Sequence, residues 1–283
     1  MPACAYATLV TTDSYLRGVK VLRASLTAQR STYPLVVMYT DKVSPEVVQE
    51  IIHLHNVILV LVENLKPRRD QTTKYAFERF EDTWTKLRVF ELTQFETVVF
   101  LDADMLCTQN MDELFTKIDP SSDSLVASLA CICNPMKLAH YPKWWTPDNC
   151  AYTKLENGIP VDPAAPKYFN SGMFVLHPNA ATFERLTSRL YKEADLSRFF
   201  FSDQCFLNEM FPDFRVVSYG YNALKTLRSA HPRQWKDDDV KNIHYILTKP
   251  WNVDPGDPKQ RDEFYDLNQL WWNAEAAAEV PAT

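Results

Sequence analysis

The stretch TVVFLDAD, residues 97–104, decides the fold because a short apolar run ends in two carboxylates separated by one small residue. A run of this length, rich in β-branched and aromatic residues, predicts a strand buried on both faces at the centre of an α/β sheet. Ligands of open α/β sheets gather beyond the carboxyl ends of the strands, which is where Asp102 and Asp104 stand. No obvious basic partner neighbours them in the sequence, and a carboxylate pair is costly to bury unless a cation joins it. We therefore expect Mg²⁺ or Mn²⁺ here, with phosphate oxygens as further ligands.

The same Asp-x-Asp pattern recurs in the run KDDD, residues 236–239, so the pattern alone is a weak signal. No strand precedes Asp237 and Asp239, and this second copy is typical of a solvated turn or the start of a helix. The apolar strand before Asp102 is what favours a metal site there.

Around this strand, the chain alternates between two patterns. Short apolar segments predict strands, and amphipathic segments predict helices. The strands are expected at 5–11, 34–40 and 57–62, and the helices at 14–28, 45–54, 84–92 and 261–278. Ser44 and Pro45 supply an N-cap and a first helical residue, and the last helix would bury Phe264, Leu267, Leu270 and Trp271. Such alternation predicts one α/β domain with a doubly wound, mostly parallel sheet.

Composition narrows the range of partners. The chain is 46% hydrophobic and 13% aromatic, so it is globular, and its net charge of -6 argues against binding nucleic acid or an anionic membrane. No apolar stretch reaches the length of a membrane span, and the N-terminus lacks the features of a secretion signal. We expect a cytoplasmic protein. The five glycines form neither G-x-G-x-x-G nor a Walker loop, so a metal and side chains would have to neutralise any bound phosphate.

The six cysteines are scattered, as in reduced cytosolic proteins. Cys131, Cys133 and Cys150 lie close in sequence to His140, and the four could be imagined as a zinc site. Because C-x-C spacing is not that of a zinc ribbon, we expect buried free thiols that line a loop instead.

The segment 131–167 is rich in proline and aromatic residues. We expect no regular structure in it, and a long ordered loop beside an active site commonly recognises an acceptor. Trp144 and Trp145 could stack on a sugar ring or pack the loop down, and the sequence leaves both options open.

Three further motifs carry polar groups. YFNSGMFVL, residues 168–176, is a strand pattern interrupted by Asn170, Ser171 and Gly172. SDQ, residues 202–204, places Ser202 as the N-cap of a helix that runs to residue 211. HYILTKPW, residues 244–251, offers an imidazole for Mn²⁺ and an ammonium for a diphosphate.

Taken in order, the Asp-x-Asp strand, FNSG (169–172), DQ (203–204) and H…KPW (244–251) resemble the signature of the retaining family 8 glycosyltransferases, the family of glycogenin and galactinol synthase. The resemblance extends to ATLVTT (7–12) and TKL (85–87), and the C-terminal part is more similar to galactinol synthase. It implies a single GT-A-type domain at 1–260, with a nucleotide-binding half at 1–115, an acceptor-side half at 116–260, and a C-terminal helix and tail at 261–283.

The resemblance also implies a role for each site residue. It places the uracil at Leu9, Thr11 and Tyr15 and the ribose at the backbone of Ala103. Asn170 and Asp203 would bind the donor sugar's hydroxyls, Gln204 would face its anomeric carbon, and Ser171 and Gly172 would also contact the donor. Lys86 would lie over the donor sugar and phosphates, and Lys249 would close over the diphosphate. It assigns Mn²⁺, with Mg²⁺ as an alternative, to Asp102, Asp104 and His244, and catalysis to Lys86, Asp203 and Gln204. Two departures from the family pattern are the missing glycine in a shortened His244–Lys249 segment and Phe200 in place of a sugar-binding acid.

We therefore expect a Mn²⁺-dependent retaining transferase that moves a hexose from a UDP-sugar to a small polyol or glycoside, with no nucleic-acid partner and with a homodimer as an option. A glycogenin-like primer that glucosylates itself is the main alternative. A metal-dependent phosphohydrolase or nucleotidyltransferase, and a UDP-sugar-binding module without activity, rank below it.

Overall fold

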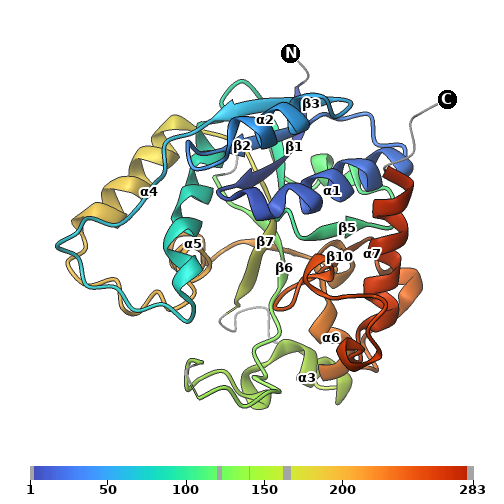
Figure 1. Cartoon of the computed structure of the whole chain (residues 1–283). Helices are drawn as coiled ribbons and strands as arrows, with labels where there is room; N and C mark the ends of the chain where they lie inside the picture. The colour runs from blue at the N-terminus through green and yellow to red at the C-terminus, as the bar shows by residue number, and fades with distance from the viewer. Residues whose placement is uncertain (1–2, 120–122, 140, 162–166, 279–283) are drawn as a thin grey trace.

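A computed structural model of the chain describes residues 3–119, 123–139, 141–161 and 167–278. At its centre lies a seven-stranded sheet with the order β3-β2-β1-β4-β7-β6-β8 (Figure 1). The strands of this sheet are β1 (Cys4–Val10), β2 (Leu35–Tyr39), β3 (Val57–Leu61), β4 (Thr97–Leu101), β6 (Val126–Leu129), β7 (Phe169–Leu176) and β8 (Arg215–Val217). β1 pairs in parallel with β2 and β4, whereas β7 is antiparallel to both β4 and β6. The predicted mostly parallel sheet is confirmed.

β4 occupies the middle of this sheet, and all five of its residues are buried. Val98 and Phe100 enter one hydrophobic core, while Val99 and Leu101 enter another on the opposite face. Burial of one such side chain contributes about 1.5–3 kcal/mol. The prediction of a strand buried on both faces is therefore confirmed, and the strand delivers Asp102 to the end of the sheet.

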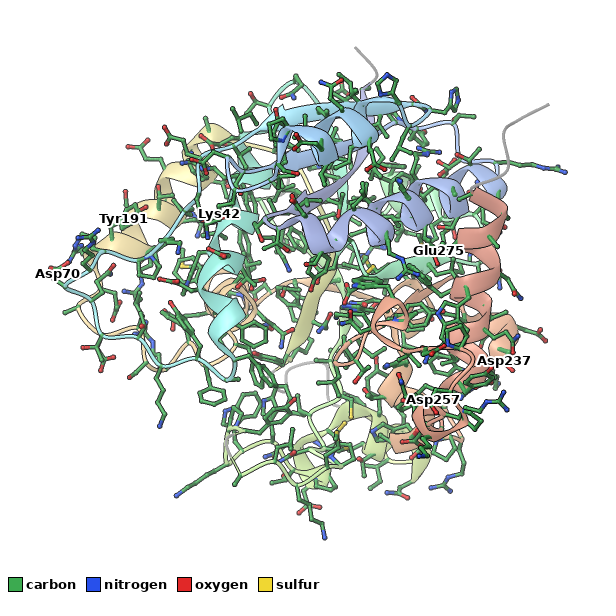
Figure 2. All side chains as sticks on the ribbon, in the orientation of Figure 1. Lys42, Asp70, Tyr191, Asp237, Asp257 and Glu275 are labelled. Atoms are coloured by element: carbon green, nitrogen blue, oxygen red, sulfur yellow. The ribbon has the colours of Figure 1, made fainter. Side chains whose placement is uncertain are left out.

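The α-helices cover both faces of the sheet. They are α1 (Leu16–Ala28), α2 (Pro45–Ile52), α3 (Ala151–Glu156), α4 (Ala180–Lys192), α5 (Asp203–Met210), α6 (Lys225–Ala230) and α7 (Tyr265–Ala278). α2 begins as predicted, since the Ser44 hydroxyl accepts a hydrogen bond from the Val47 amide at 3.4 Å. α7 lies beside α1 (Figure 1), and Arg17 donates to Glu275, labelled in Figure 2, over 2.6 Å.

A second, three-stranded sheet places the C-terminal half against the Asp-x-Asp turn. Its order is β5 (Met105–Cys107), β10 (Asn242–His244), β9 (Ala223–Leu224). His244 pairs with Met105, one residue after Asp104, and the Tyr245 amide donates to the Asp104 carbonyl at 2.9 Å. Strands of two or three residues leave no periodic signal, so the sequence pattern did not predict this sheet.

Three predicted elements differ in the structure. The helix expected at 84–92 is a 3₁₀ segment that already begins at Glu78 and ends at Glu91. The segment 131–167, expected to be irregular, contains α3. In α7, Leu270 is 46% exposed, whereas Asn268 is buried. The buried stripe follows the spacing i, i+3, i+4, i+7 from Phe264, which selects residue 268 and excludes 270.

Candidate active site

All the site residues predicted from the sequence line one cavity of about 520 Å³ beyond the carboxyl end of β4. These residues are Leu9, Thr11, Tyr15, Lys86, Asp102, Ala103, Asp104, Asn170, Ser171, Gly172, Asp203, Gln204, His244 and Lys249. The structure thus brings them together, although they come from strands, helices and loops spread over the whole chain.

The carboxylate site, which we define as Asp102, Asp104 and His244, forms one part of the cavity wall. One ligand atom of each of the three lies within 4.8 Å of the others. Nε2 of His244 is 3.3 Å from Oδ1 of Asp104 and 3.8 Å from Oδ2 of Asp102. Two carboxylates and an imidazole are a donor set suited to Mn²⁺ or Mg²⁺.

His244 is held in place by two neighbours. Its Nδ1 lies 2.9 Å from the amide oxygen of Asn222, which can only accept, so Nδ1 donates and Nε2 faces the carboxylates. Asn222 in turn donates to Asn170 Oδ1 at 3.0 Å. Gly172 has no side chain, and a Cβ there would lie 2.3 Å from Cε1 of His244. Sequence reasoning gave Asn222 no role, because only the fold shows this network.

Two lysines from distant segments neutralise the carboxylates. Nζ of Lys86 lies 3.0 Å from Asp102 Oδ1 and 3.1 Å from Asp203 Oδ2, and Lys249 forms an ion pair with Asp104. No basic residue adjoins the pair in the sequence, and the fold supplies two from distant segments. The fold brings the Glu78–Glu91 segment and the loop after β10 to the end of β4, which local sequence cannot show.

The two carboxylates differ in their acidity. Burial raises the pKa of Asp102, and the charge of Lys86 offsets only part of this effect. Burial acts in the same direction on Asp104, but the charges of Lys249 and His244 outweigh it and hold the pKa of Asp104 well below its usual value. Asp104 is therefore the firmer anion of the two, and a cation would find it deprotonated.

The start of α5 forms the facing wall. Asp203 accepts a hydrogen bond from the Ser171 hydroxyl at 2.8 Å, and Gln204 Oε1 accepts from Asn170 Nδ2 at 2.9 Å. Ser202 does not cap the helix through its side chain as predicted. It has a φ of 47°, and its hydroxyl pairs with Thr83 Oγ1 at 3.0 Å, so its oxygen points away from the helix amides.

The two neighbouring tryptophans of the loop have different surroundings. Trp145 is 8% exposed, lines the cavity and stacks on Phe201 with ring centroids 4.8 Å apart. Trp144 is 48% exposed and lines a different, more open cavity beside Lys143 and Tyr168. The second Asp-x-Asp copy is an exposed 3₁₀ turn, as predicted, and its Asp237 lies at the edge of the molecule in Figure 2.

Comparisons with known proteins identify the family of the chain. A family model described as "Glycosyl transferase family 8" matches residues 7–254. The chain belongs to this family. Galactinol synthase 1 of Solanum lycopersicum is 30% identical over 96% of this chain and 81% of its own length, and galactinol synthase 7 of Arabidopsis thaliana is 31% identical over 95% and 80%.

Solved structures support the GT-A fold of this family 8 glycosyltransferase. The galactosyltransferase LgtC, in complex with donor and acceptor sugar analogues, superimposes with a TM-score of 0.65 at 17% identity, over 100% of this chain and 98% of LgtC. The glycosyltransferase GlyE of Streptococcus pneumoniae gives 0.61 at 18% identity, over 96% of this chain and 59% of GlyE. Among the described residues, no helix combines the length and apolar composition that crossing a membrane requires.

Proposed function

We propose that this family 8 enzyme is a retaining hexosyltransferase that uses a UDP-sugar donor, a divalent cation (Mn²⁺, with Mg²⁺ as an alternative) and a small polyol or glycoside acceptor in the cytoplasm. One observation carries the proposal: a single cavity holds the carboxylate site, two lysines and the Asp203–Gln204 pair. The relatives named galactinol synthases support a hexose donor and a polyol acceptor.

The carboxylate site fits the proposed cation, because two of its three donors are hard carboxylate oxygens and the third, His244, is oriented by Asn222. A cation bound there would neutralise the charge that develops on the departing diphosphate. Lys249, already poised at Asp104, would add a second positive charge to the same group. Both charges are needed because the chain has no glycine-rich phosphate loop.

Asp203 and Gln204 would hold the donor sugar and not attack it. Oδ2 of Asp203 already takes the Ser171 hydroxyl and the Lys86 ammonium, and the amide of Gln204 is a poor nucleophile. Retaining glycosidases instead use a free carboxylate as nucleophile. We therefore favour attack by the acceptor hydroxyl on the face from which UDP leaves, with the hydroxyl proton passing to the departing phosphate oxygen.

The glycogenin-like alternative needs an accessible tyrosine on the protein itself. Tyr152 is 5% exposed, and its hydroxyl donates to the Leu129 carbonyl at 2.8 Å. Tyr221 donates to Glu113 at 2.9 Å. Neither phenol is presented as an acceptor, which favours a diffusible acceptor over self-glucosylation.

A UDP-release screen tests the proposal. UDP-glucose, UDP-galactose and UDP-N-acetylglucosamine are each offered with Mn²⁺ and with polyol, phenolic or oligosaccharide acceptors, and the product's anomeric configuration is read by NMR. We expect release that depends on an added polyol, with the donor's configuration retained. A ladder of hexoses on the protein by intact-mass spectrometry would establish the self-glucosylating alternative, and acceptor-independent release would point to hydrolysis.

A further inference from the structure

Three cysteines and a histidine form a second ligand set that differs in chemistry from the carboxylate site, and one of the cysteines, Cys131, also lines the candidate active-site cavity. We define Cys131, Cys133, Cys150 and His231 as the thiol cluster, and one ligand atom of each lies within 4.8 Å of the others. Cys131 and Cys133 follow β6, Cys150 immediately precedes α3, and His231 immediately follows α6. α3 and α6 are neighbours in Figure 1. The histidine is not His140, the partner considered from the sequence, which lies outside the described residues.

The distances match those around a tetrahedral ion. Nε2 of His231 lies 3.3 Å from Sγ of Cys131, 3.2 Å from Sγ of Cys133 and 3.7 Å from Sγ of Cys150. Zn–S and Zn–N bonds of about 2.3 and 2.0 Å at a tetrahedral angle place sulfur and nitrogen about 3.5 Å apart. The three sulfurs therefore surround the ring nitrogen at the separations that a shared zinc ion would set.

A carboxylate behind the histidine completes the arrangement. Nδ1 of His231 lies 3.1 Å from Oε2 of Glu156, whose Oε1 accepts from the Arg233 amide at 3.0 Å. With Nδ1–H donating to this carboxylate, Nε2 turns its lone pair to the sulfurs. Histidines that bind a metal usually donate their other ring nitrogen to a carboxylate in this way.

Hydrogen bonding between unmetallated thiols explains the geometry less well. A neutral imidazole with its Nδ1 proton engaged offers one lone pair, while three sulfurs crowd around it. His231 is 2% exposed and Cys150 is fully buried, so neither side chain is open to hydrogen bonding with bulk water. All six cysteines lie among the described residues and are free of disulfides.

We propose that Cys131, Cys133, Cys150 and His231 bind one Zn²⁺ ion as a closed, structural site. Three thiolates and an imidazole are a standard set for structural zinc, and four protein ligands leave no open position for catalysis. The soft sulfur ligands also give this site a different metal preference from the carboxylate site, which suits harder cations. The proposal goes beyond the expectation of free thiols, which the structure shows without disulfides.

The proposed ion would cross-link the acceptor-side loop to the C-terminal half. Residues between Cys133 and Cys150 line the candidate active site, among them Asn134, Met136, Tyr141 and Trp145. A zinc ion bound by the cysteines at both ends of this segment and by His231 would hold the wall of the cavity in one position. This consequence rests on the proposed function, whereas the metal site itself does not.

Metal analysis of the purified protein tests the proposal. We expect one zinc per chain in the wild type and in Asp104→Asn, and a loss of nearly all of it in Cys150→Ser and His231→Ala. Cys4→Ser, which removes a cysteine outside the cluster, should keep it. Because Asp104→Asn removes a ligand of the carboxylate site alone, retention of zinc there separates this proposal from the proposed function.

Two measurements on the wild type keep the test valid if those variants fail to fold. Protein grown with cobalt should show thiolate-to-cobalt charge-transfer absorption, and a thiol reagent should release zinc in step with its reaction at three cysteines. Zinc-free protein that is folded and active, with these thiols freely reactive, would overturn the proposal. A disulfide among them, seen as two cysteines that react with an alkylating reagent only after reduction, would also overturn it.

Discussion

The carboxylate site and the thiol cluster are two compact ligand sets in one chain, and they differ in the hardness and the number of their donors. The carboxylate site has three protein donors facing a cavity, which leaves positions for phosphate oxygens. The thiol cluster has four donors and a carboxylate behind its histidine. Open sites are typical of catalysis and closed ones of structure. The comparison teaches that the count and softness of donors, and not their proximity alone, separate the two roles.

The largest expected effect comes from breaking the carboxylate site. Asp104→Asn removes a charge and a ligand while keeping the shape of the side chain, so we expect UDP release to fall by about 10²–10³-fold or more. The matched control is Asp239→Asn in the exposed second Asp-x-Asp copy, which should keep full activity. Equal activity of the two variants would mean that the carboxylate site does not act in transfer.

An intermediate effect is expected from Gly172→Ala, which adds a methyl group where a Cβ would lie 2.3 Å from the His244 ring. The displaced imidazole should weaken metal binding by about 10–100-fold. The Mn²⁺ concentration for half-maximal activity should rise accordingly, while zinc content stays unchanged. Gly256→Ala, where a Cβ would meet only Asp254 Oδ1 at 3.2 Å, is the control. An unaltered Mn²⁺ requirement in Gly172→Ala would exclude His244 as a ligand.

The smallest effect concerns the loop between the cysteines. Trp145→Ala should raise the acceptor KM about 3- to 10-fold, because loss of its stacking on Phe201 costs about 0.5–1.5 kcal/mol. Trp144→Ala, at an exposed position that lines a different cavity, should change the acceptor KM less than about twofold. The affinity for UDP, measured by calorimetry, serves as the second readout. A matching loss of UDP affinity in Trp145→Ala would show that the loop is structural for the whole cavity.

Much of the carboxylate site could be predicted because its information is local. The apolar run before Asp102 and the interrupted strand around Gly172 each carry their own pattern, and an open α/β sheet gathers such segments at one edge. The capping of α2 by Ser44 is equally local. Ser202 shows where local prediction fails. A serine before a helix predicts a side-chain N-cap, but Ser202 has a positive φ and its hydroxyl contacts the Glu78–Glu91 segment instead.

The thiol cluster could not be predicted in full because its fourth member is remote. His231 follows Cys150 by 81 residues, and only the packing of α6 against α3 brings them together. Lys86 and Lys249 also neutralise the carboxylates from two distant segments, and the resemblance to the family, not a local pattern, placed them at this site. Local sequence patterns predict helices and strands and the residues at their ends. Residues that small sheets and short helices bring together can be identified only from the three-dimensional structure.

The most direct test of the account is the metal dependence of UDP release after the carboxylate site has been emptied. The protein is dialysed exhaustively against EDTA, one equivalent of Zn²⁺ per chain is returned for the proposed thiol cluster, and UDP release is assayed with UDP-galactose and a polyol while Mn²⁺ is titrated back. The account predicts no release without added Mn²⁺ and full recovery with it. Full turnover in EDTA after that dialysis would contradict it.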